Sequence, residues 1–374
     1  MKFIVASLVA LASAHAIFGR EIQKRASNSW GGSNLYFLHG LSNSDQDYYI
    51  NTLASDGAKV VRLWATGLGS GCQKGSNIPT SIPDLEPDSI GTFNDTVLDA
   101  LDGVLAKLVA KEIKAIISPH DGNAFGLNSC DVYGKVYGCA KSNSAADSFY
   151  SSTTAKSQYD ARMAHVLNYK SPSSGKAWSQ WNDAILAFDI QNEPFQQAED
   201  EASNNDPSDW LCGRAGNMKL IINGSGVKLA TGGIGGDQSH GNNLMPKAIE
   251  CSAIDLVSIH AYVGTANFWS SNLPNLESTA AFHNKLLYVE EWGVSTDYAD
   301  DFNSQVAAIN GAGVPWLYWQ FTPGPDATQD CWTGCCTGYD GFEIGLNSTK
   351  GNVEQALENA ASANGAQDWS GKVH

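Results

Sequence analysis

Two apolar runs in this sequence end on carboxylates, side chains that proteins use to give or accept protons and to attack electrophilic carbon. The first run is "AFDIQNEPFQ", residues 187–196, in which Asn192, Glu193 and Pro194 follow a stretch typical of a buried strand. The second is "KLLYVEEWG", residues 285–293, which reaches Glu290 and Glu291. Burying a carboxylate costs free energy unless the group is paired. These glutamates are therefore candidate reacting groups.

Polar or aromatic residues also stand at the ends of four other apolar runs. "VVRLW" contains Arg62, "ISPH" ends on His120, "SIHAY" contains His260 and Tyr262, and "LYWQ" contains Trp319. One such residue would be explained by packing, since a lone histidine is most often a satisfied core residue. So many residues in corresponding positions indicate a site.

Bringing these residues together requires strands whose carboxyl ends meet. Strand-like runs are expected at 35–40, 58–64, 113–120, 184–192, 227–231, 254–260, 285–291 and 314–321. They alternate with helical patterns at 45–55, 94–112, 154–170, 209–223, 243–251, 297–313 and 352–363. Continuous apolar strands are typical of a parallel sheet covered on both faces. The pattern predicts an α/β fold, a single (β/α)8 TIM barrel with inserted loops, whose chemistry lies at the carboxyl ends of the strands.

The ordered series of strand ends resembles glycoside hydrolase family 5, a (β/α)8 family of retaining glycosidases. The matching stretches are "VVRLW", "ISPH", "QNEP", "SIHAY", "EEWG" and "LYWQ", and they span roughly residues 35–325. Retaining hydrolysis uses two carboxyl groups about 5–5.5 Å apart, one to protonate the leaving oxygen and one to attack the anomeric carbon. The resemblance implies that Glu193 is the acid/base and Glu291 the nucleophile.

Glu290 competes with Glu291 for the nucleophile's place. Adjacent side chains on a regular strand point to opposite faces, so only one of the two is expected to enter the barrel mouth. The family places its nucleophile directly before an aromatic residue and a glycine, which selects Glu291 and leaves Glu290 a supporting residue. Repulsion between two close carboxylates is also expected to raise the pKa of Glu193 and keep it protonated.

The resemblance also implies supporting roles around the two carboxylates. Arg62 would hydrogen-bond Glu291 and keep it ionised. Asn192 would bind the sugar 2-hydroxyl, and Tyr262 would contact Glu291. Without the resemblance, Arg62 is interpreted as a structural ion pair and Asn192 as a cap.

Histidines and aromatic residues complete the expected site. His120 and His260 would contact sugar or orient a carboxylate, and Trp319 would form the floor under the reacting sugar. Further aromatic residues at or near strand ends are candidates for outer subsites, although each could equally pack a loop; they are Trp64, Phe125, Phe195 and Trp292.

The N-terminus has the pattern of an export signal. Residues 1–16 combine a basic residue, an apolar run and the ending "AHA", as a signal peptide does. Residues 17–25 end in the dibasic pair "KR", which indicates a propeptide, although a merely flexible segment is the alternative. Residues 26–374 would then form one catalytic domain, and the chain is expected to be secreted and extracellular.

Cysteines and sequons agree with export. The eight cysteines are an even number, which favours disulfides, and Cys130–Cys139 is a plausible loop staple. The group Cys331, Cys335 and Cys336 lacks paired CxxC spacing and a nearby histidine, so no zinc site is expected there. Three N-x-S/T sequons begin at Asn94, Asn223 and Asn347.

Charge narrows the class of partner. The formal net charge is −16, and because residues 1–25 hold four basic residues and one acidic residue, the mature chain would stand at −19. Such a chain repels nucleic acid and anionic membranes. A neutral polysaccharide, β-mannan or β-glucan, is the expected partner, bound by a monomer. No cofactor, metal or membrane span is expected.

More than one activity remains open. "VRLWA", "EEWG" and "LYWQF" are more similar to the fungal mannanase branch of the family than to its cellulases, which favours an endo-β-1,4-mannanase. An endo-β-glucanase is the alternative, and "FLHGLSNS" departs from the Gly-x-Asn that commonly follows the first strand. A metal-dependent barrel hydrolase could use His120, Asp121 and His260, but it would need an HxH pair after the first strand. A sugar-binding barrel without catalysis conflicts with the presence of both glutamates.

Overall fold

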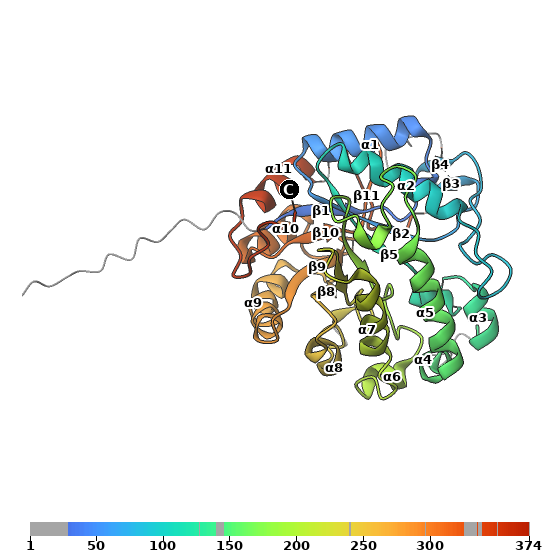
Figure 1. Cartoon of the computed structure of the whole chain (residues 1–374). Helices are drawn as coiled ribbons and strands as arrows, with labels where there is room; N and C mark the ends of the chain where they lie inside the picture. The colour runs from blue at the N-terminus through green and yellow to red at the C-terminus, as the bar shows by residue number, and fades with distance from the viewer. Residues whose placement is uncertain are drawn as a thin grey trace, which may run out of the picture.

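A closed barrel of eight parallel strands forms the centre of the computed structural model (Figure 1). The structure describes residues 29–126, 128–139, 146–238, 241–295, 297–324, 335, 339–349 and 351–373. The barrel strands are β1 (Gly31–Asn34), β2 (Val60–Trp64), β5 (Lys114–Ser118), β6 (Ile185–Asp189), β7 (Lys228–Ala230), β8 (Leu256–His260), β9 (Leu286–Trp292) and β10 (Trp316–Tyr318). Each strand pairs with its neighbours in chain order, and β1 pairs with β10 to close the circle. The expected (β/α)8 barrel is confirmed, whereas the expected signal peptide (1–16) and propeptide (17–25) lie outside the described residues.

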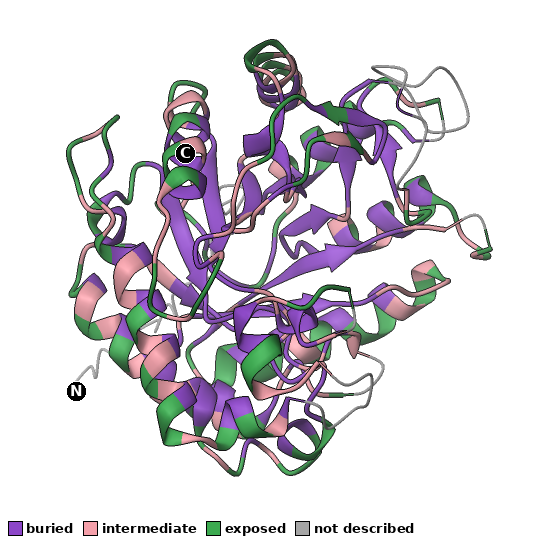
Figure 2. Ribbon diagram, turned by 90° about the vertical axis from the view of Figure 1, so that its right-hand side faces the viewer, coloured by how far each residue is buried: buried purple, intermediate pink, exposed green. Residues whose placement is uncertain are grey.

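Helices surround the barrel. The longer ones are α1 (Asn43–Ser55), α2 (Thr96–Val109), α5 (Thr153–Asn168), α7 (Trp210–Ile222), α9 (Ala266–Phe282), α10 (Phe302–Ala312) and α11 (Val353–Ser362). Shorter ones are α3 (Val132–Tyr137), α4 (Asp147–Ser151), α6 (Glu199–Ser203) and α8 (Pro246–Glu250), with 3-10 turns at Leu38–Gly40, Gly122–Ala124 and Trp178–Gln180. Figure 2 shows buried strands inside a shell of helices whose outward faces are exposed. No helix of the described chain has the length and apolarity needed to cross a membrane.

Two small sheets lie outside the barrel. The hairpin β3 (Gly71–Gln73) and β4 (Ser76–Ile78) is antiparallel, and β11 (Phe321–Thr322) pairs with β12 (Ile344–Gly345) in parallel. Both belong to the long connections that follow β2 and β10.

The helices form where apolar spacing and capping residues coincide. In α2 the buried side chains recur every three or four residues, as the sequence pattern predicts, at Val97, Leu98, Leu101, Val104, Leu105 and Leu108. Ser42 caps α1 and Asp301 caps α10, each side chain accepting a hydrogen bond from a backbone N–H of the first turn. The apolar faces pack against the strands in one continuous core, while a smaller cluster including Trp30, Tyr288 and Trp369 fills the barrel interior.

The first strand differs from the sequence expectation. Residues 35–40 form a turn and a 3-10 helix, and the strand is Gly31–Asn34 instead. A Cβ on Gly32 would overlap the carbonyl of Val60 on β2, so close approach of the strands requires glycine there. Glycine carries little strand propensity, which is why the pattern pointed to the more apolar neighbouring run. The Gly-x-Asn that seemed absent is Gly32-Ser33-Asn34.

The sequence pattern also missed a long helix. Helix α9 spans Ala266–Phe282 although Pro274 lies inside it, where proline removes a backbone donor and usually ends a helix. Its buried side chains Trp269, Leu273, Glu277 and Ala280 nevertheless follow a helical spacing. The short helices α3, α4 and α6 were likewise not expected, because they are too brief to show a period.

Among the residues that the structure describes, three disulfides tie the connections together. Cys130–Cys139 closes the short loop that the sequence suggested. Cys72 bonds Cys335 across 263 residues, and Cys212 bonds Cys251. Cys331 and Cys336 lie outside the described residues.

Candidate active site

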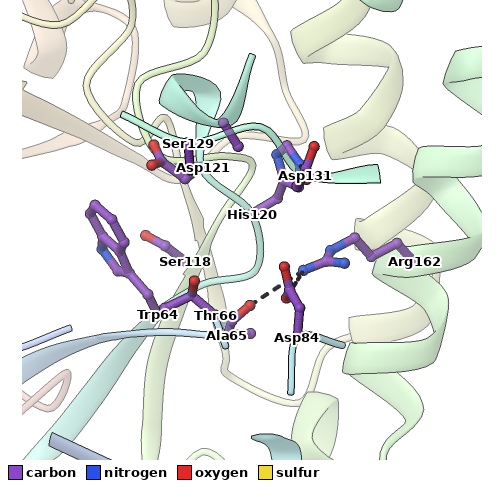
Figure 3. Close-up of a pocket in the computed structure, with 11 residues that line it drawn as sticks. Trp64, Ala65, Thr66, Asp84, Ser118, His120, Asp121, Ser129, Asp131 and Arg162 are labelled. Carbon is purple, nitrogen blue, oxygen red and sulfur yellow. Dashed lines mark hydrogen bonds and ion pairs between the residues drawn. The ribbon is translucent and has the colours of Figure 1, made fainter. Parts of the chain in front are cut away.

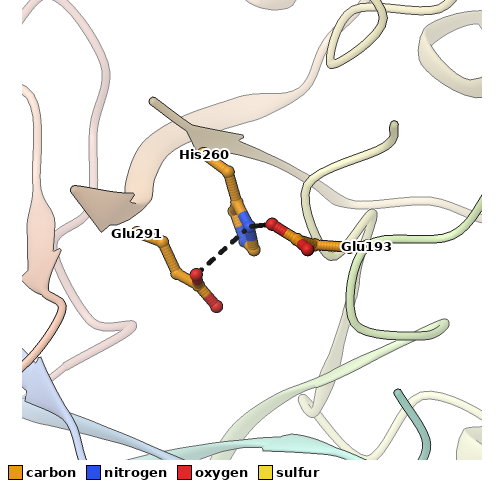
Figure 4. Close-up of side chains that lie close together, drawn as sticks. All are labelled: Glu193, His260 and Glu291. Atoms are coloured by element: carbon orange, nitrogen blue, oxygen red, sulfur yellow. Dashed lines mark hydrogen bonds and ion pairs between the residues drawn. The ribbon is translucent and has the colours of Figure 1, made fainter. Parts of the chain in front are cut away.

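Two carboxylates meet at the carboxyl ends of β6 and β9. Glu193 follows β6 and Glu291 is part of β9, 98 positions further along the chain. An oxygen of each, together with a ring nitrogen of His260 at the end of β8, lies within 4.8 Å of the others. Figure 4 shows the imidazole of His260 between the two carboxylates. The barrel therefore brings together the pair that the sequence singled out.

The backbone at Glu193 is held in an unusual conformation. Its φ is 43°, in the left-handed region where a side chain costs about 1–2 kcal/mol. Its N–H donates to the carbonyl of Gly232 (2.7 Å), and its own carbonyl lies so close to Gly122 that a Cβ there would overlap it. Asn123 Nδ2 donates to Glu193 Oε2 (2.8 Å). The surrounding loops thus hold the carboxylate in one direction.

Both Glu290 and Glu291 point into the site, which corrects the expectation that only one could. Ile259 pairs with Val289 but His260 pairs with Glu291, so β9 has one residue more than β8 at this step. The register with β10 shifts over the same stretch. This bulge at Glu290 breaks the alternation of a regular strand. Two adjacent carboxylates then share the barrel interior.

Arg62 on β2 is the fully buried centre of the site. Its Nη1 pairs with Glu291 Oε1, and its Nη2 donates to Asn192 Oδ1 (2.7 Å). Its Nε lies 3.0 Å from Asp189 Oδ2 and 3.3 Å from Glu290 Oε1. One guanidinium, which also donates to Asn34 on β1, therefore contacts three carboxylates and side chains from three other strands, as its fork of donors allows.

His260 connects the three glutamates of the site. Its Nδ1 lies 3.0 Å from Glu193 Oε1 and 3.5 Å from Glu291 Oε2, and its Nε2 lies 3.0 Å from Glu290 Oε2. Tyr262 donates to Glu291 Oε2 (2.7 Å). Glu291 is thus bonded through both oxygens, to Arg62 on one side and to Tyr262 on the other.

His120 and Asn192 lie beside the pair. The two ring nitrogens of His120 contact Asp131 Oδ2 and Gln191 Nε2, both at 2.8 Å, so it does not contact either reacting carboxylate. Asn192 accepts from Arg62 and donates through Nδ2 to Asp121 Oδ1 (2.8 Å).

Aromatic rings form an open surface next to the carboxylates. Trp319 and Trp64 are both partly exposed, with ring centroids 5.5 Å apart. Tyr36 stacks on Trp319 at 5.9 Å with 10° between the planes. A small cavity of about 50 Å³ adjoins Trp64, with His120, Asp121, Asp131 and Arg162 among its walls (Figure 3).

Three residues expected to line outer subsites are instead core residues. Phe125 and Trp292 are 0% exposed and Phe195 is 1% exposed. Phe125 packs on Phe149, Phe195 on Tyr150 and Trp292 on Phe302. Rings covered in this way cannot stack on a sugar, so only Trp64 of the four stays a candidate.

Burial and charge set the protonation of the site. Burial lowers the pKa of His260, but Glu291, Glu193 and Glu290 outweigh it and raise it to about 10. Burial, opposed by His260 and Arg62, leaves the pKa of Glu291 above its ordinary value. Burial raises the pKa of Glu193 as well, but the hydrogen bond and charge of His260 outweigh burial and bring this pKa below the ordinary value. The raised pKa expected for Glu193 is therefore wrong for the free protein, where the hydrogen bond and charge of His260 outweigh burial.

The pKa values of the deeper pair Asp189 and Glu290 shift in opposite directions. Burial raises the pKa of Glu290, yet Arg62 and His260 outweigh it and lower it to about 2. Burial and Glu290 raise the pKa of Asp189 well above its ordinary value despite Arg62. The two buried cations therefore favour the charged form of Glu290, whereas burial and Glu290 favour the protonated form of Asp189.

A metal ion would have to compete for ligands that are already bonded. Glu193, His260 and Glu291 are the group of the described residues with suitable spacing for an ion. Both nitrogens of His260 lie against carboxylates, and both carboxylates are bonded to cations or donors. The arrangement suits proton transfer and nucleophilic attack better than ligation.

Several site residues carried no clear signal in the sequence. Asn34 donates to the carbonyl of Glu290 (2.8 Å) and accepts from Arg62, but it belongs to the misplaced first strand. Asp189 lies inside the apolar run 184–192 and Asn123 three positions beyond the run 113–120, where a polar residue is readily taken for part of a strand end or a loop. Tyr36 was assigned to a strand. Only the order of strands around the barrel reveals these contacts.

Comparisons with known proteins agree with the geometry. The family model described as Cellulase (glycosyl hydrolase family 5) matches residues 19–324. The probable mannan endo-1,4-beta-mannosidase A of Aspergillus niger is 26% identical over 317 residues, which cover 78% of this chain and 76% of that protein. The mannan endo-1,4-beta-mannosidase A of Emericella nidulans is 24% identical over 305 residues, covering 78% and 73%. The endo-1,4-beta-mannanase structure from Rhizomucor miehei has the same fold, with a TM-score of 0.69, 20% identity, and coverage of 89% of this chain and 94% of that one.

Asp189→Asn and Glu290→Gln are matched amide replacements that test the charge assignment. We expect Asp189→Asn to change the free energy of unfolding by less than about 1 kcal/mol, because the pKa of Asp189 is raised well above its ordinary value and the amide has the shape of the protonated acid. Glu290→Gln removes a charge that faces two buried cations and should cost about 3–5 kcal/mol. Urea denaturation at neutral pH measures both, and equal costs would contradict the assignment.

His260 should make stability depend on pH. Its pKa is about 10 in the folded protein against 6.5 for an ordinary histidine, so its contribution is complete below pH 6.5 and is lost as pH rises to about 10. The free energy of unfolding should fall in that window by up to about 1.4 kcal/mol per pH unit. Urea denaturation across the window measures the slope. His260→Gln should flatten it, and an unchanged slope would argue against a charged His260.

Proposed function

The chain belongs to glycosyl hydrolase family 5, and from that premise we propose that it cleaves internal β-1,4-mannosidic bonds of mannans with retention at the anomeric carbon. The observation that carries the proposal is the pair Glu193 and Glu291, whose oxygens lie within 4.8 Å. Retaining glycosidases use carboxyl groups about 5–5.5 Å apart, whereas inverting ones need about 6.5–9.5 Å to admit a water. The short separation favours direct attack by a carboxylate.

The proposed reaction has two displacements. Glu193 gives its proton to the leaving oxygen while Glu291 attacks the anomeric carbon, so the glycosidic bond breaks and a glycosyl ester forms. Arg62 and Tyr262 hold the two oxygens of Glu291 in the attacking orientation. Glu193 then takes a proton from water, whose oxygen attacks the anomeric carbon and releases Glu291.

Proton supply to Glu193 is the demanding step. In the free protein the proton of the pair resides on His260, whose Nδ1 is 3.0 Å from Glu193 Oε1. A sugar that covers Glu193 and His260 excludes water and raises the free-energy cost of keeping a carboxylate and an imidazolium there. The neutral form, imidazole beside glutamic acid, then becomes favourable. His260 would thus hold the proton that Glu193 delivers.

Other residues would hold the sugar. Trp319 would floor the reacting ring, with Trp64 beside it. Asn192 Nδ2 gives one hydrogen to Asp121 and has a second for the 2-hydroxyl. His120, whose nitrogens face Asp131 and Gln191, would support the backbone next to Asn192 rather than contact sugar. No cofactor takes part in this scheme.

The choice of mannan follows the relatives. The curated relatives reported above are named mannan endo-1,4-beta-mannosidases. An endo-β-glucanase is the second candidate, because the matching family model is described as a cellulase. Both activities use the same two carboxylates.

We place the enzyme outside the cell. The disulfides fit an oxidising compartment, and sequon residues Asn223 and Asn347 are exposed. With the export pattern of residues 1–25, this supports a secreted glycoprotein whose mature chain, 26–374, acts as a monomeric catalytic domain.

The substrate is tested by comparing polysaccharides. Reducing ends released from locust-bean mannan, carboxymethylcellulose and laminarin are measured side by side at equal mass. We expect mannan to be degraded fastest, with internal cleavage producing a rapid fall in viscosity. Activity on glucan alone would reject the mannan choice and leave the family chemistry intact.

The catalytic pair is tested by amide replacement. Glu193→Gln and Glu291→Gln should each lower kcat by about 10²–10⁴-fold, because each removes a group that reacts. Oligosaccharide binding, followed by calorimetry, should persist in both variants. Glu354→Gln on the exposed face of α11 is the control and should behave as wild type. Full turnover by Glu193→Gln would overturn the assignment.

A further inference from the structure

The indole of Trp319 is anchored by an ionic cluster outside the barrel. Trp319 Nε1 donates to Asp340 Oδ2 (3.0 Å), and the same oxygen accepts from Lys74 Nζ. Lys74 Nζ also pairs with Glu343 Oε1 (2.6 Å) and lies 5.9 Å from the centroid of the Trp319 ring. The ammonium of Lys74 thus binds the carboxylate of Asp340, which in turn binds the indole of Trp319.

This cluster is largely removed from solvent. The side chain of Lys74 is 7% exposed and that of Glu343 is 2% exposed, while Asp340 reaches the surface at 37%. Glu343 also accepts from the backbone N–H groups of Asp340 and Gly341. Charge-assisted hydrogen bonds in a buried setting hold their partners in one geometry. Lys74 and Glu343 therefore hold the position of Asp340, the residue to which the indole of Trp319 is hydrogen-bonded.

The hairpin β3–β4 carries Lys74 and is itself tied down on both sides. Cys72 forms the disulfide with Cys335, and Gln73 Nε2 donates to the hydroxyl of Tyr36, whose ring stacks on Trp319. Residues 72–74 therefore tie the hairpin to Cys335, to Tyr36 and to the carboxylates of Asp340 and Glu343 in turn. The turn of the hairpin lies directly against Tyr339, since a Cβ on Gly75 would overlap the hydroxyl of that residue.

The same cluster continues toward the nucleophile. Phe342, between Asp340 and Glu343 in the chain, packs on Tyr262 with centroids 4.8 Å apart, and its carbonyl accepts from Tyr318 (2.8 Å). Tyr262 in turn bonds Glu291. Segment 339–343 thus lies between the aromatic surface and a residue that orients Glu291.

We propose that Lys74 is a positioning residue that fixes the indole of Trp319, through Asp340, as the floor under the reacting sugar. The inference rests on the proposed function in one respect, namely that Trp319 contacts the sugar. Loss of the ammonium leaves Asp340 Oδ1 bonded to the backbone N–H of Phe342 but removes the partner of Oδ2, the oxygen that accepts from the indole, and lets the indole turn. A displaced platform misaligns the anomeric carbon with Glu291, and misplacement by about 1 Å can cost a hundredfold in rate.

The test compares Lys74→Met in two backgrounds, wild type and Trp319→Phe. On the polysaccharide that wild type degrades fastest, Lys74→Met should lower kcat/KM by about tenfold in the wild-type background, with kcat falling more than KM rises. In the Trp319→Phe background the same change should cost less than about twofold, because the group on which it acts is gone. Lys74→Arg should restore most of the loss. Lys176→Met, which breaks an exposed pair with Asp183, is the control and should match wild type.

Asp340→Asn serves as a second variant, because it keeps the shape of the linking side chain and tests the same chain of contacts if Lys74→Met folds poorly. It too should lose activity only when Trp319 is present. Equal losses in both backgrounds for either variant would overturn the role of Lys74, and so would a Trp319→Phe protein with unchanged kcat/KM. In those cases the proposed function still stands if Glu193→Gln abolishes the activity of the wild-type enzyme. A wild type that cleaves no glycan overturns both.

Discussion

One buried guanidinium organises this structure. Arg62 lies inside the barrel without exposure to solvent and contacts Asn34 on β1, Asn192 after β6, and both Glu290 and Glu291 on β9. A cation in that position is tolerated only when its donors are satisfied, and the carboxylates are tolerated only because the cation is there. The registers of four strands are therefore tied to one side chain.

The second constraint is the number of protons in the site. His260 lies between Glu193, Glu290 and Glu291 and is charged in the free protein. The bulge on β9 places the extra carboxylate of Glu290 beneath it. A regular strand would leave His260 with fewer acidic partners and a lower pKa. The same fold irregularity that corrects the expected alternation thus contributes to the raised pKa of His260.

Much of this was accessible from the sequence, and the exceptions have physical reasons. Apolar strands alternating with helices indicated the barrel, and residue types at strand ends indicated the reacting groups. The glycine-rich first strand was missed because close packing, not propensity, makes it a strand. Helix α9 was missed because of Pro274. Burial of Phe125 and the role of Asp189 depend on contacts between distant segments, which periodicity does not encode.

Direct attack by Glu291 with Glu193 as proton donor is the central step of the proposed function, and the configuration of the first product tests it. Proton NMR can follow hydrolysis of a β-1,4-mannooligosaccharide, or of the matching glucan oligomer, before mutarotation is complete. Double displacement by a pair within 4.8 Å predicts that the β-anomer appears first and the α-anomer follows slowly. Initial release of the α-anomer would contradict the account, because it requires a water between the two carboxylates.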